Sequence, residues 1–252
     1  MERMMTIALI CVFMAYTGAE QDTQPKPEAK SQSVPAVEAA PTADQILEKY
    51  VAVIGGRAVV EKLTSRVMRG SLVTSAGNAP IEVYEKAPNR FLVIIDSPVS
   101  GKSQNAYDGA VAWSQNTQRG LREMSGPEVE NFKREYDLHR EIRLKEFYPR
   151  MTVKGRVKIG DSEANVIEAL TAEGLSEAMY FDLITGLLVR RDVTIQGSTL
   201  EAYFEDYREV DGIKIPFTVR RSRPGFSFTY KFDEVRHNVA IEDARFNKPV
   251  AQ

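Results

Sequence analysis

The chain has 252 residues and a formal charge of −2, because 35 acidic side chains face 33 lysines and arginines. Apolar residues make up 43% of it, enough for the core of one sizeable globular domain. The near-neutral balance argues against a nucleic-acid partner, which would require a basic face. Cys11 is the only cysteine, so a disulfide within the chain is excluded.

The densest basic segments are Arg190-Arg191 and residues 220–223, which read Arg-Arg-Ser-Arg. Charged side chains on solvated strand edges are the simpler interpretation, because they keep an edge from pairing with other chains. A site for an anionic partner is the alternative.

Residues 1–19 are predicted to form an export signal peptide. Arg3 supplies a positive charge, residues 4–16 are apolar but too few to span a membrane as a helix, and residues 17–19 are small enough for cleavage. This predicts a periplasmic protein; an uncleaved membrane anchor is the alternative. Cys11 follows the bulky Ile10, which does not favour lipidation, and the mature chain would then contain no thiol.

Residues 20–41 are rich in proline, alanine, glutamine, serine and charged residues, and they contain no aromatic side chain. Such a segment cannot bury enough apolar surface to offset the entropy lost on ordering. It is therefore predicted to be a disordered tether. The folded domain is expected over residues 42–249.

A helix is expected to open this domain. Thr42 and Gln45 form a capping-box pattern, apolar residues follow at helical spacing, and Gly55-Gly56 ends the helix. A second, short helix is expected over about residues 57–63. Both have one apolar side, which must lie against a sheet.

Turn signals recur at intervals of roughly 8–14 residues through the rest of the chain, the spacing of an antiparallel meander. They predict one large curved antiparallel sheet of about 11–12 strands, with five in residues 66–115 and seven in 151–236. A helical region is expected between them, over residues 127–147, and the fold class is α+β. The turns lie at 76–78, 88–89, 100–101, 108–109, 119–120, 160–161, 173–174, 185–186, 196–197, 211–212 and 224–225.

The strand faces predict more apolar area than the helices can cover. Residues 213–219 and 226–232 alternate between apolar and polar side chains, whereas residues 91–95 are apolar on both faces. A helix covers a strip about 10 Å wide, and strands lie about 4.8 Å apart, so the expected helices cover about half of the sheet. The remainder must close on itself, meet a partner or hold an apolar ligand.

The lining of this predicted cavity is expected to come from large apolar residues on several strands. Ordinary core packing is the alternative for each of them. The candidates are Phe91, Val93, Trp113, Met179, Phe181, Phe217, Val219, Phe226, Phe228 and Tyr230.

Three segments, Tyr180–Asp192, Tyr203–Val219 and Phe232–Pro249, resemble the outer-membrane lipoprotein-sorting proteins of the LolA/LolB-like superfamily. The opening residues 42–56 and a central stretch resemble the same group, so the likeness covers the whole folded part. The resemblance implies a half-open β-barrel with helices packed on its concave face and an apolar cavity between them. Members of this group carry acylated lipoproteins or lipids through the periplasm or serve as accessory envelope modules.

No catalytic motif is present in the sequence. The histidines His139 and His237 do not form an HExxH pattern and are expected to be solvated, and there is no GxSxG turn or phosphate-binding glycine loop. We therefore expect no enzymatic activity, cofactor or metal. The predicted function is a non-catalytic periplasmic carrier or binder of lipid or of an acylated lipoprotein. The alternative is a non-catalytic interaction module that docks on an envelope membrane protein.

Overall fold

The computed structural model describes residues 40–195 and 197–250. The predicted export signal and residues 20–39 of the predicted tether lie outside these ranges. Within them, no helix is both long and apolar enough to cross a membrane.

The first helices form where the sequence indicates. Helix α1 spans Ala43–Val53 and α2 spans Arg57–Val60. The capping box is confirmed: Gln45 N donates to Thr42 Oγ1 at 3.2 Å, and Thr42 N donates to Gln45 Oε1 at 2.8 Å. Gly55 follows the helix with φ +126°, and a Cβ there would lie 2.2 Å from the Gly212 carbonyl oxygen. Glycine thus lets α1 end in contact with a strand turn.

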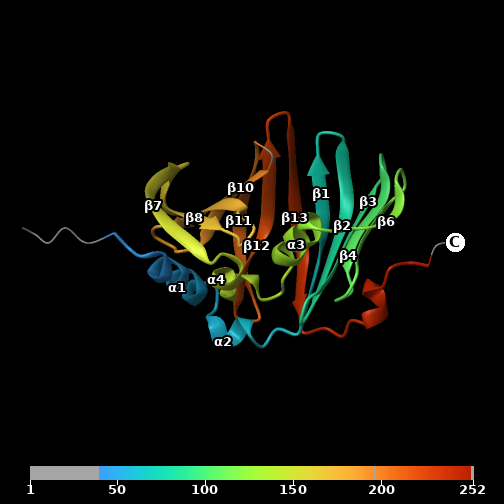
Figure 1. The fold of residues 1–252 in the computed structure, drawn as a ribbon, viewed down its shortest axis with the longest axis horizontal. Coiled ribbons are helices and arrows are strands. Elements are labelled where there is room, and N and C mark those ends of the chain that lie inside the picture. Colours follow the sequence, from blue (N-terminus) through green and yellow to red (C-terminus); the bar gives the residue numbers. More distant parts are fainter. Residues whose placement is uncertain (1–39, 196, 251–252) are drawn as a thin grey trace, which may run out of the picture. The chain divides into compact units, whose positions relative to one another are not determined.

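The described part of the chain contains thirteen strands in one antiparallel sheet, a curved half-barrel with helices on its concave face, as predicted (Figure 1). The sheet order is β6-β5-β4-β3-β2-β1-β13-β12-β11-β10-β9-β8-β7, so β6 and β7 are its edges. The strands are β1 Ser65–Thr74, β2 Gly77–Lys86, β3 Arg90–Ser97, β4 Gly101–Tyr107, β5 Ala112–Asn116, β6 Gly120–Glu123, β7 Arg150–Ile159, β8 Ser162–Leu170, β9 Ser176–Asp182, β10 Leu188–Ile195, β11 Ser198–Val210, β12 Ile213–Arg223 and β13 Phe226–His237.

The five strands predicted in residues 66–115 and the seven in 151–236 correspond to β1–β5 and β7–β13, and β6 is the one strand that was not predicted. This strand has four residues, two of them charged, so its sequence shows no alternation from which a strand could be inferred. Its place in the fold depends on the ladder with β5, in which Trp113 is opposite Glu123 and Asn116 is opposite Gly120.

The chain must cross from one edge of the sheet to the other between β6 and β7. It does so through α3, Pro127–Glu135, the 3-10 helix η1, Arg140–Ile142, and α4, Leu144–Phe147. The single helical region predicted over 127–147 is thus three short pieces. Asp137 accounts for one break, because its side chain accepts a hydrogen bond from His139 N at 2.9 Å and competes with helical bonding.

The core lies on both faces of the sheet. We call residues 127–147, which contain α3, η1 and α4, the crossing segment. On the concave face, α1, α2 and the crossing segment pack on β2, β3, β8, β9, β12 and β13. On the convex face, Leu92 and Trp113 pack under the C-terminal segment, which contains the 3-10 helix η2, Asp243–Phe246. Residues 91–95 are apolar on both faces because a helix covers one side of β3 and this segment covers the other.

Candidate functional site

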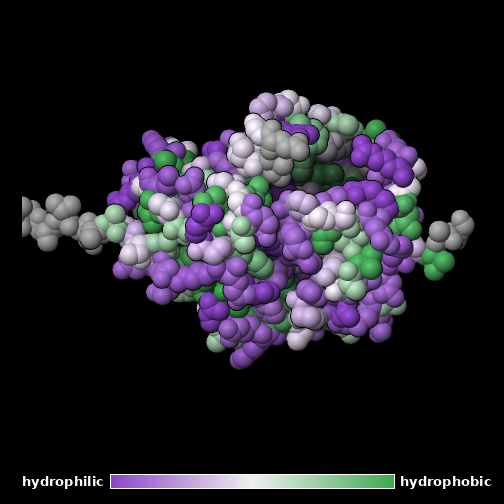
Figure 2. Space-filling model, viewed as in Figure 1, coloured by the Kyte–Doolittle hydropathy of each residue, from purple (hydrophilic) through white to green (hydrophobic). Residues whose placement is uncertain are grey.

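Two adjoining cavities lie between the crossing segment and the concave face of the sheet. Their volumes are about 300 Å³ and about 140 Å³, and Glu135, Tyr136, Arg221 and Tyr230 line both. We call the pair the concave cavity. Figure 2 shows a hollow with a hydrophobic floor and hydrophilic rims over the region where Figure 1 places β13 and β1. The volume of the concave cavity is at the lower end of the range for small-molecule sites, which is roughly 300–1,000 Å³.

Much of the apolar wall of the concave cavity consists of alternate residues of the strands, whose side chains point to the same face of the sheet. Ile81 and Val83 of β2 lie opposite Ile95 and Val93 of β3 in the ladder, so all four point to the concave side. Further apolar wall comes from β1, from β13 itself and from the strands β10, β11 and β12 beyond it. These residues are Met68, Val193, Leu200, Phe204, Ile215, Val219 and Phe232.

An aromatic row extends from the solvent into this cavity along β13. It consists of Phe226, Phe228, Tyr230 and Phe232, with successive ring centroids 5.5, 5.1 and 6.4 Å apart. Phe226, at the hairpin tip, is 49% exposed, whereas Phe232 is 8% exposed. The row therefore forms a continuous apolar surface from outside to inside.

Five of the ten predicted lining residues lie in the concave cavity or along the aromatic row. Val93, Val219 and Tyr230 line the concave cavity, and Phe226 and Phe228 continue the aromatic row outward. These five residues remain our proposed lining.

The other candidates lie elsewhere. Phe91 is buried beneath α3, where its ring stacks on Phe132 and Tyr136 at 5.7 and 5.0 Å. Trp113 lies on the convex face, and its Nε1 donates to the Phe246 carbonyl oxygen at 2.9 Å. The remaining three, Met179, Phe181 and Phe217, are fully packed members of the concave core.

A cluster of charged side chains lines the larger cavity. Among the described residues it comprises Arg134, Arg140, Arg191 and Arg221 with the carboxylates Glu135 and Glu177, and we call it the arginine cluster. The interpretation of Arg191 and Arg221 as solvated strand-edge residues is wrong. Alternation turns Arg190 and Arg220 outward and their neighbours inward. The turn at Pro224-Gly225 is the sequence signal that could have identified Arg221, because it sets the register in which Arg221 lies opposite Phe228.

Glu135, at the end of α3, holds two strands of the sheet to the helix. Both of its oxygens accept hydrogen bonds, one from Arg191 of β10 and one from Arg221 of β12. Burial tends to raise the pKa of Glu135, but the charges of Arg191, Arg221 and Arg140 outweigh it and hold that pKa well below its usual range. Glu135 is therefore an anion at every physiological pH.

Glu177 of β9 is less well satisfied. Its oxygens lie 3.7 Å from nitrogens of Arg134, Arg140 and Arg191, too far for hydrogen bonds. In the described part of the protein, Glu177 Oε2 and the Nε atoms of Arg140, Arg191 and Arg221 are buried without a hydrogen-bond partner. Four cations thus meet two carboxylates around the larger cavity.

The smaller cavity has different electrostatics. Arg66 Nε donates to Glu85 Oε2 at 2.6 Å, and this buried pair is neutral as a whole. Glu141 also lines the smaller cavity, and Arg221 is shared with the larger one. The charged side chains that line the smaller cavity alone therefore do not favour a bound anion.

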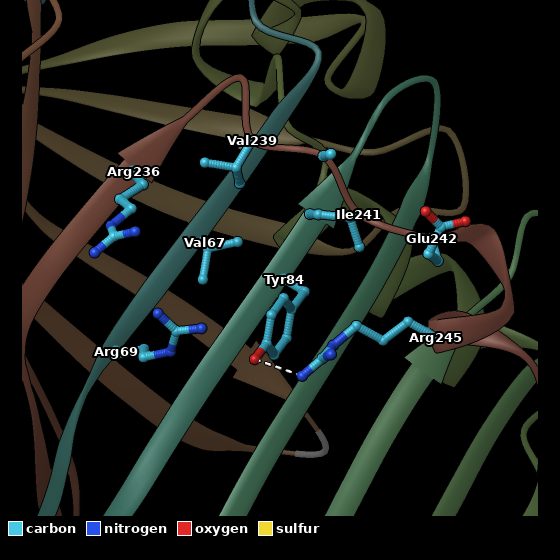
Figure 3. Close-up of a pocket in the computed structure, with 9 residues that line it drawn as sticks. Val67, Arg69, Tyr84, Arg236, Val239, Ile241, Glu242 and Arg245 are labelled. Carbon is cyan, nitrogen blue, oxygen red and sulfur yellow. Dashed lines mark hydrogen bonds between the residues drawn. The ribbon is translucent and has the colours of Figure 1, made fainter.

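A separate pocket of about 290 Å³ lies on the convex face (Figure 3). Arg245 stacks on the Tyr84 ring, 3.9 Å from its centroid, and donates to the Tyr84 hydroxyl at 2.6 Å. Arg69 donates to Glu234 at 2.9 Å, and Arg236 pairs with the same carboxylate. The arginines of this pocket already have partners in the protein, which makes the concave cavity the better candidate site.

The histidines form no site. His237 was expected to be solvated, but its side chain is 0% exposed because it ends β13 opposite Arg66 in the middle of the sheet. His139 is part-buried, with Nε2 3.0 Å from the Leu63 carbonyl oxygen. Over the described ranges, no group of three or more histidine, cysteine, aspartate or glutamate side chains could hold a metal ion.

The sequence matches no protein-family model and no curated protein. Solved structures do match it. A DUF1329 family protein from Desulfovibrio piger has a TM-score of 0.58 at 16% identity, over 81% of this chain and 96% of that one. A LolA superfamily protein from Nitrosomonas europaea also has a TM-score of 0.58, at 12% identity over 83% and 99%.

A putative outer membrane lipoprotein-sorting protein domain from Vibrio parahaemolyticus gives a TM-score of 0.54 at 17% identity, over 80% of this chain and 97% of that one. At these identities the likeness concerns the fold. The chain has a LolA-like fold, which is the fold that the resemblance of its sequence implies.

Proposed function

We propose that the protein binds a lipid or the acyl chain of a lipoprotein in the concave cavity and carries it, without catalysis, through the periplasm. The observation that carries this proposal is the cavity itself, which has an apolar wall and an aromatic row leading to solvent. The name of the Vibrio parahaemolyticus structure, a lipoprotein-sorting domain, is consistent with such a cargo.

The free energy available from this cavity suits reversible binding. A buried methylene contributes about 0.8 kcal/mol, so about ten of them contribute roughly 8 kcal/mol before the costs of association. A net affinity in the micromolar range allows a carrier to release its cargo to an acceptor.

Leu200 offers a test of the cavity. It is half-buried in β11 and lines the larger cavity, so an indole ring in its place fills part of the space. We expect Leu200→Trp to reduce binding of a fluorescent fatty acid at least fivefold, on the scale of losing about one or two buried methylenes. Displacement titration measures this, with circular dichroism to verify the fold.

Val157→Trp is the matched control, because Val157 is 42% exposed on the edge strand β7. It should leave the affinity unchanged. A wild-type protein that binds no lipid probe, and that is recovered bare from its own envelope by native mass spectrometry, contradicts the proposal. Cross-linking to one stoichiometric membrane protein in that case supports the interaction-module alternative.

A further inference from the structure

We propose that the ligand is an amphiphile with an oxyanion, a carboxylate or a phosphate, at one end of its acyl chain, and that the arginine cluster binds this group. The inference rests on the proposed function, because it specifies the head group of a ligand whose tail occupies the concave cavity.

The first argument is the charge imbalance. Burying a cation without a compensating anion is costly, and buried arginines are normally paired. Among the residues that the structure describes, the larger cavity is lined by Arg134, Arg140, Arg191 and Arg221, with only Glu135 and Glu177 to balance them. One bound oxyanion would reduce this excess of positive charge.

The second argument is the unused hydrogen-bonding capacity. The side chains of Arg140 and Arg191 are only 7% and 6% exposed, yet the Nε of each has no partner among the residues that the structure describes. A guanidinium carries five N–H donors and no acceptor, and it matches carboxylate and phosphate oxygens in a fixed geometry. Glu177, at 3.7 Å, is too distant to take up these donors.

The third argument is the position of the cluster beside an apolar surface. Arg221 lies opposite Phe228 in the β12–β13 ladder, and its guanidinium is 5.7 Å from the Tyr230 ring centroid. A head group at the arginines therefore lies next to the aromatic row, along which an acyl chain can extend. The acidic Glu85 and Glu141 lie in the smaller cavity, so the anion belongs in the larger one.

The ligand test compares hexadecanoate, hexadecyl phosphate, hexadecanol and inorganic phosphate by isothermal titration calorimetry. The two anionic amphiphiles are kept below their critical micelle concentrations. We expect both anionic amphiphiles to bind at least about tenfold more tightly than hexadecanol, the gain expected for a charge-assisted hydrogen bond, and inorganic phosphate to bind far more weakly.

Equal binding of hexadecanol and hexadecanoate overturns the inference and leaves the proposed function standing. Binding of inorganic phosphate as tight as that of hexadecyl phosphate overturns it as well, because the site would then serve a free anion. If no long-chain compound binds, the proposed function fails together with the inference.

Two variants, one that removes a positive charge and one that removes a negative charge, separate head-group binding from a structural effect. Arg140→Gln removes a cation that hydrogen-bonds to no carboxylate, and it should weaken hexadecanoate binding on the order of tenfold while leaving hexadecanol unchanged. Glu177→Gln removes the competing negative charge and should tighten hexadecanoate binding severalfold.

Arg122→Gln is the control for a lost arginine, since Arg122 is exposed on β6 and bonded to Glu128. It should change neither affinity. If Arg140→Gln and Glu177→Gln both weaken hexadecanoate and hexadecanol to the same degree, the cluster is purely structural and the inference is wrong.

Discussion

Replacing Glu135 with glutamine is expected to lower the free energy of unfolding by about 3 kcal/mol at pH 7, because the variant leaves buried arginines without their counter-charge. Glu135 joins α3 to Arg191 of β10 and Arg221 of β12, and its side chain is three-quarters buried. Denaturation in urea measures the effect. Glu130→Gln, in an exposed pair with Lys133 on the same helix, is the control and should change stability by less than about 0.5 kcal/mol.

The same variant should show a characteristic pH dependence. The pKa of Glu135 is lower in the folded protein than the value of about 4.3 typical of an unfolded chain. Its contribution is therefore complete above that unfolded pKa and is lost as the pH falls toward the folded pKa. The difference in stability between wild type and Glu135→Gln should shrink from pH 7 to pH 3. A difference that stays constant or grows on acidification contradicts this account.

Replacing Phe91 with alanine is expected to destabilise the protein by about 3–5 kcal/mol, the usual cost of removing a buried phenylalanine. The Phe91 ring is 1% exposed and forms a stack with Phe132 of α3 and Tyr136 at its end, so it anchors the helix that covers the concave cavity. We expect increased amide hydrogen exchange in α3 in addition to the loss of stability.

Phe226→Ala is the matched control, because it removes the same side chain from the exposed end of the aromatic row. It should change stability by less than about 1 kcal/mol and weaken hexadecanoate binding roughly threefold, the value of one aromatic contact. If both variants are equally stable, Phe91 does not hold α3 in place.

The fold was largely predictable because its signals are local. Glycine turns and strand alternation identify the strands, and Thr42 with Gln45 identifies the first helix cap. Strand β6 escaped prediction because its pairing with β5 is a tertiary feature that four residues do not encode. The breaks after Glu135 were not predicted because the apolar stripe runs through them, although Asp137, which competes with helical bonding, was a local signal for one of them.

The candidate site was harder to predict because strand parity fixes which residues share a face but not which face is concave. Trp113 and Phe91 have similar chemistry, yet one packs under η2 and the other under α3. The arginines were missed because charged residues in strands are usually solvated. The register across the turn at Pro224-Gly225 places Arg221 on the same face as Phe228 and Tyr230.

The most direct test of the account is a crystal structure of the protein with a fatty acid that carries bromine at its tail end, located by anomalous scattering. The account places the carboxylate within hydrogen-bonding distance of Arg140 or Arg191 and the bromine against the apolar wall of the concave cavity. Bromine found only in the convex pocket of Figure 3, or a concave cavity that holds no ligand at saturating fatty acid, would contradict it.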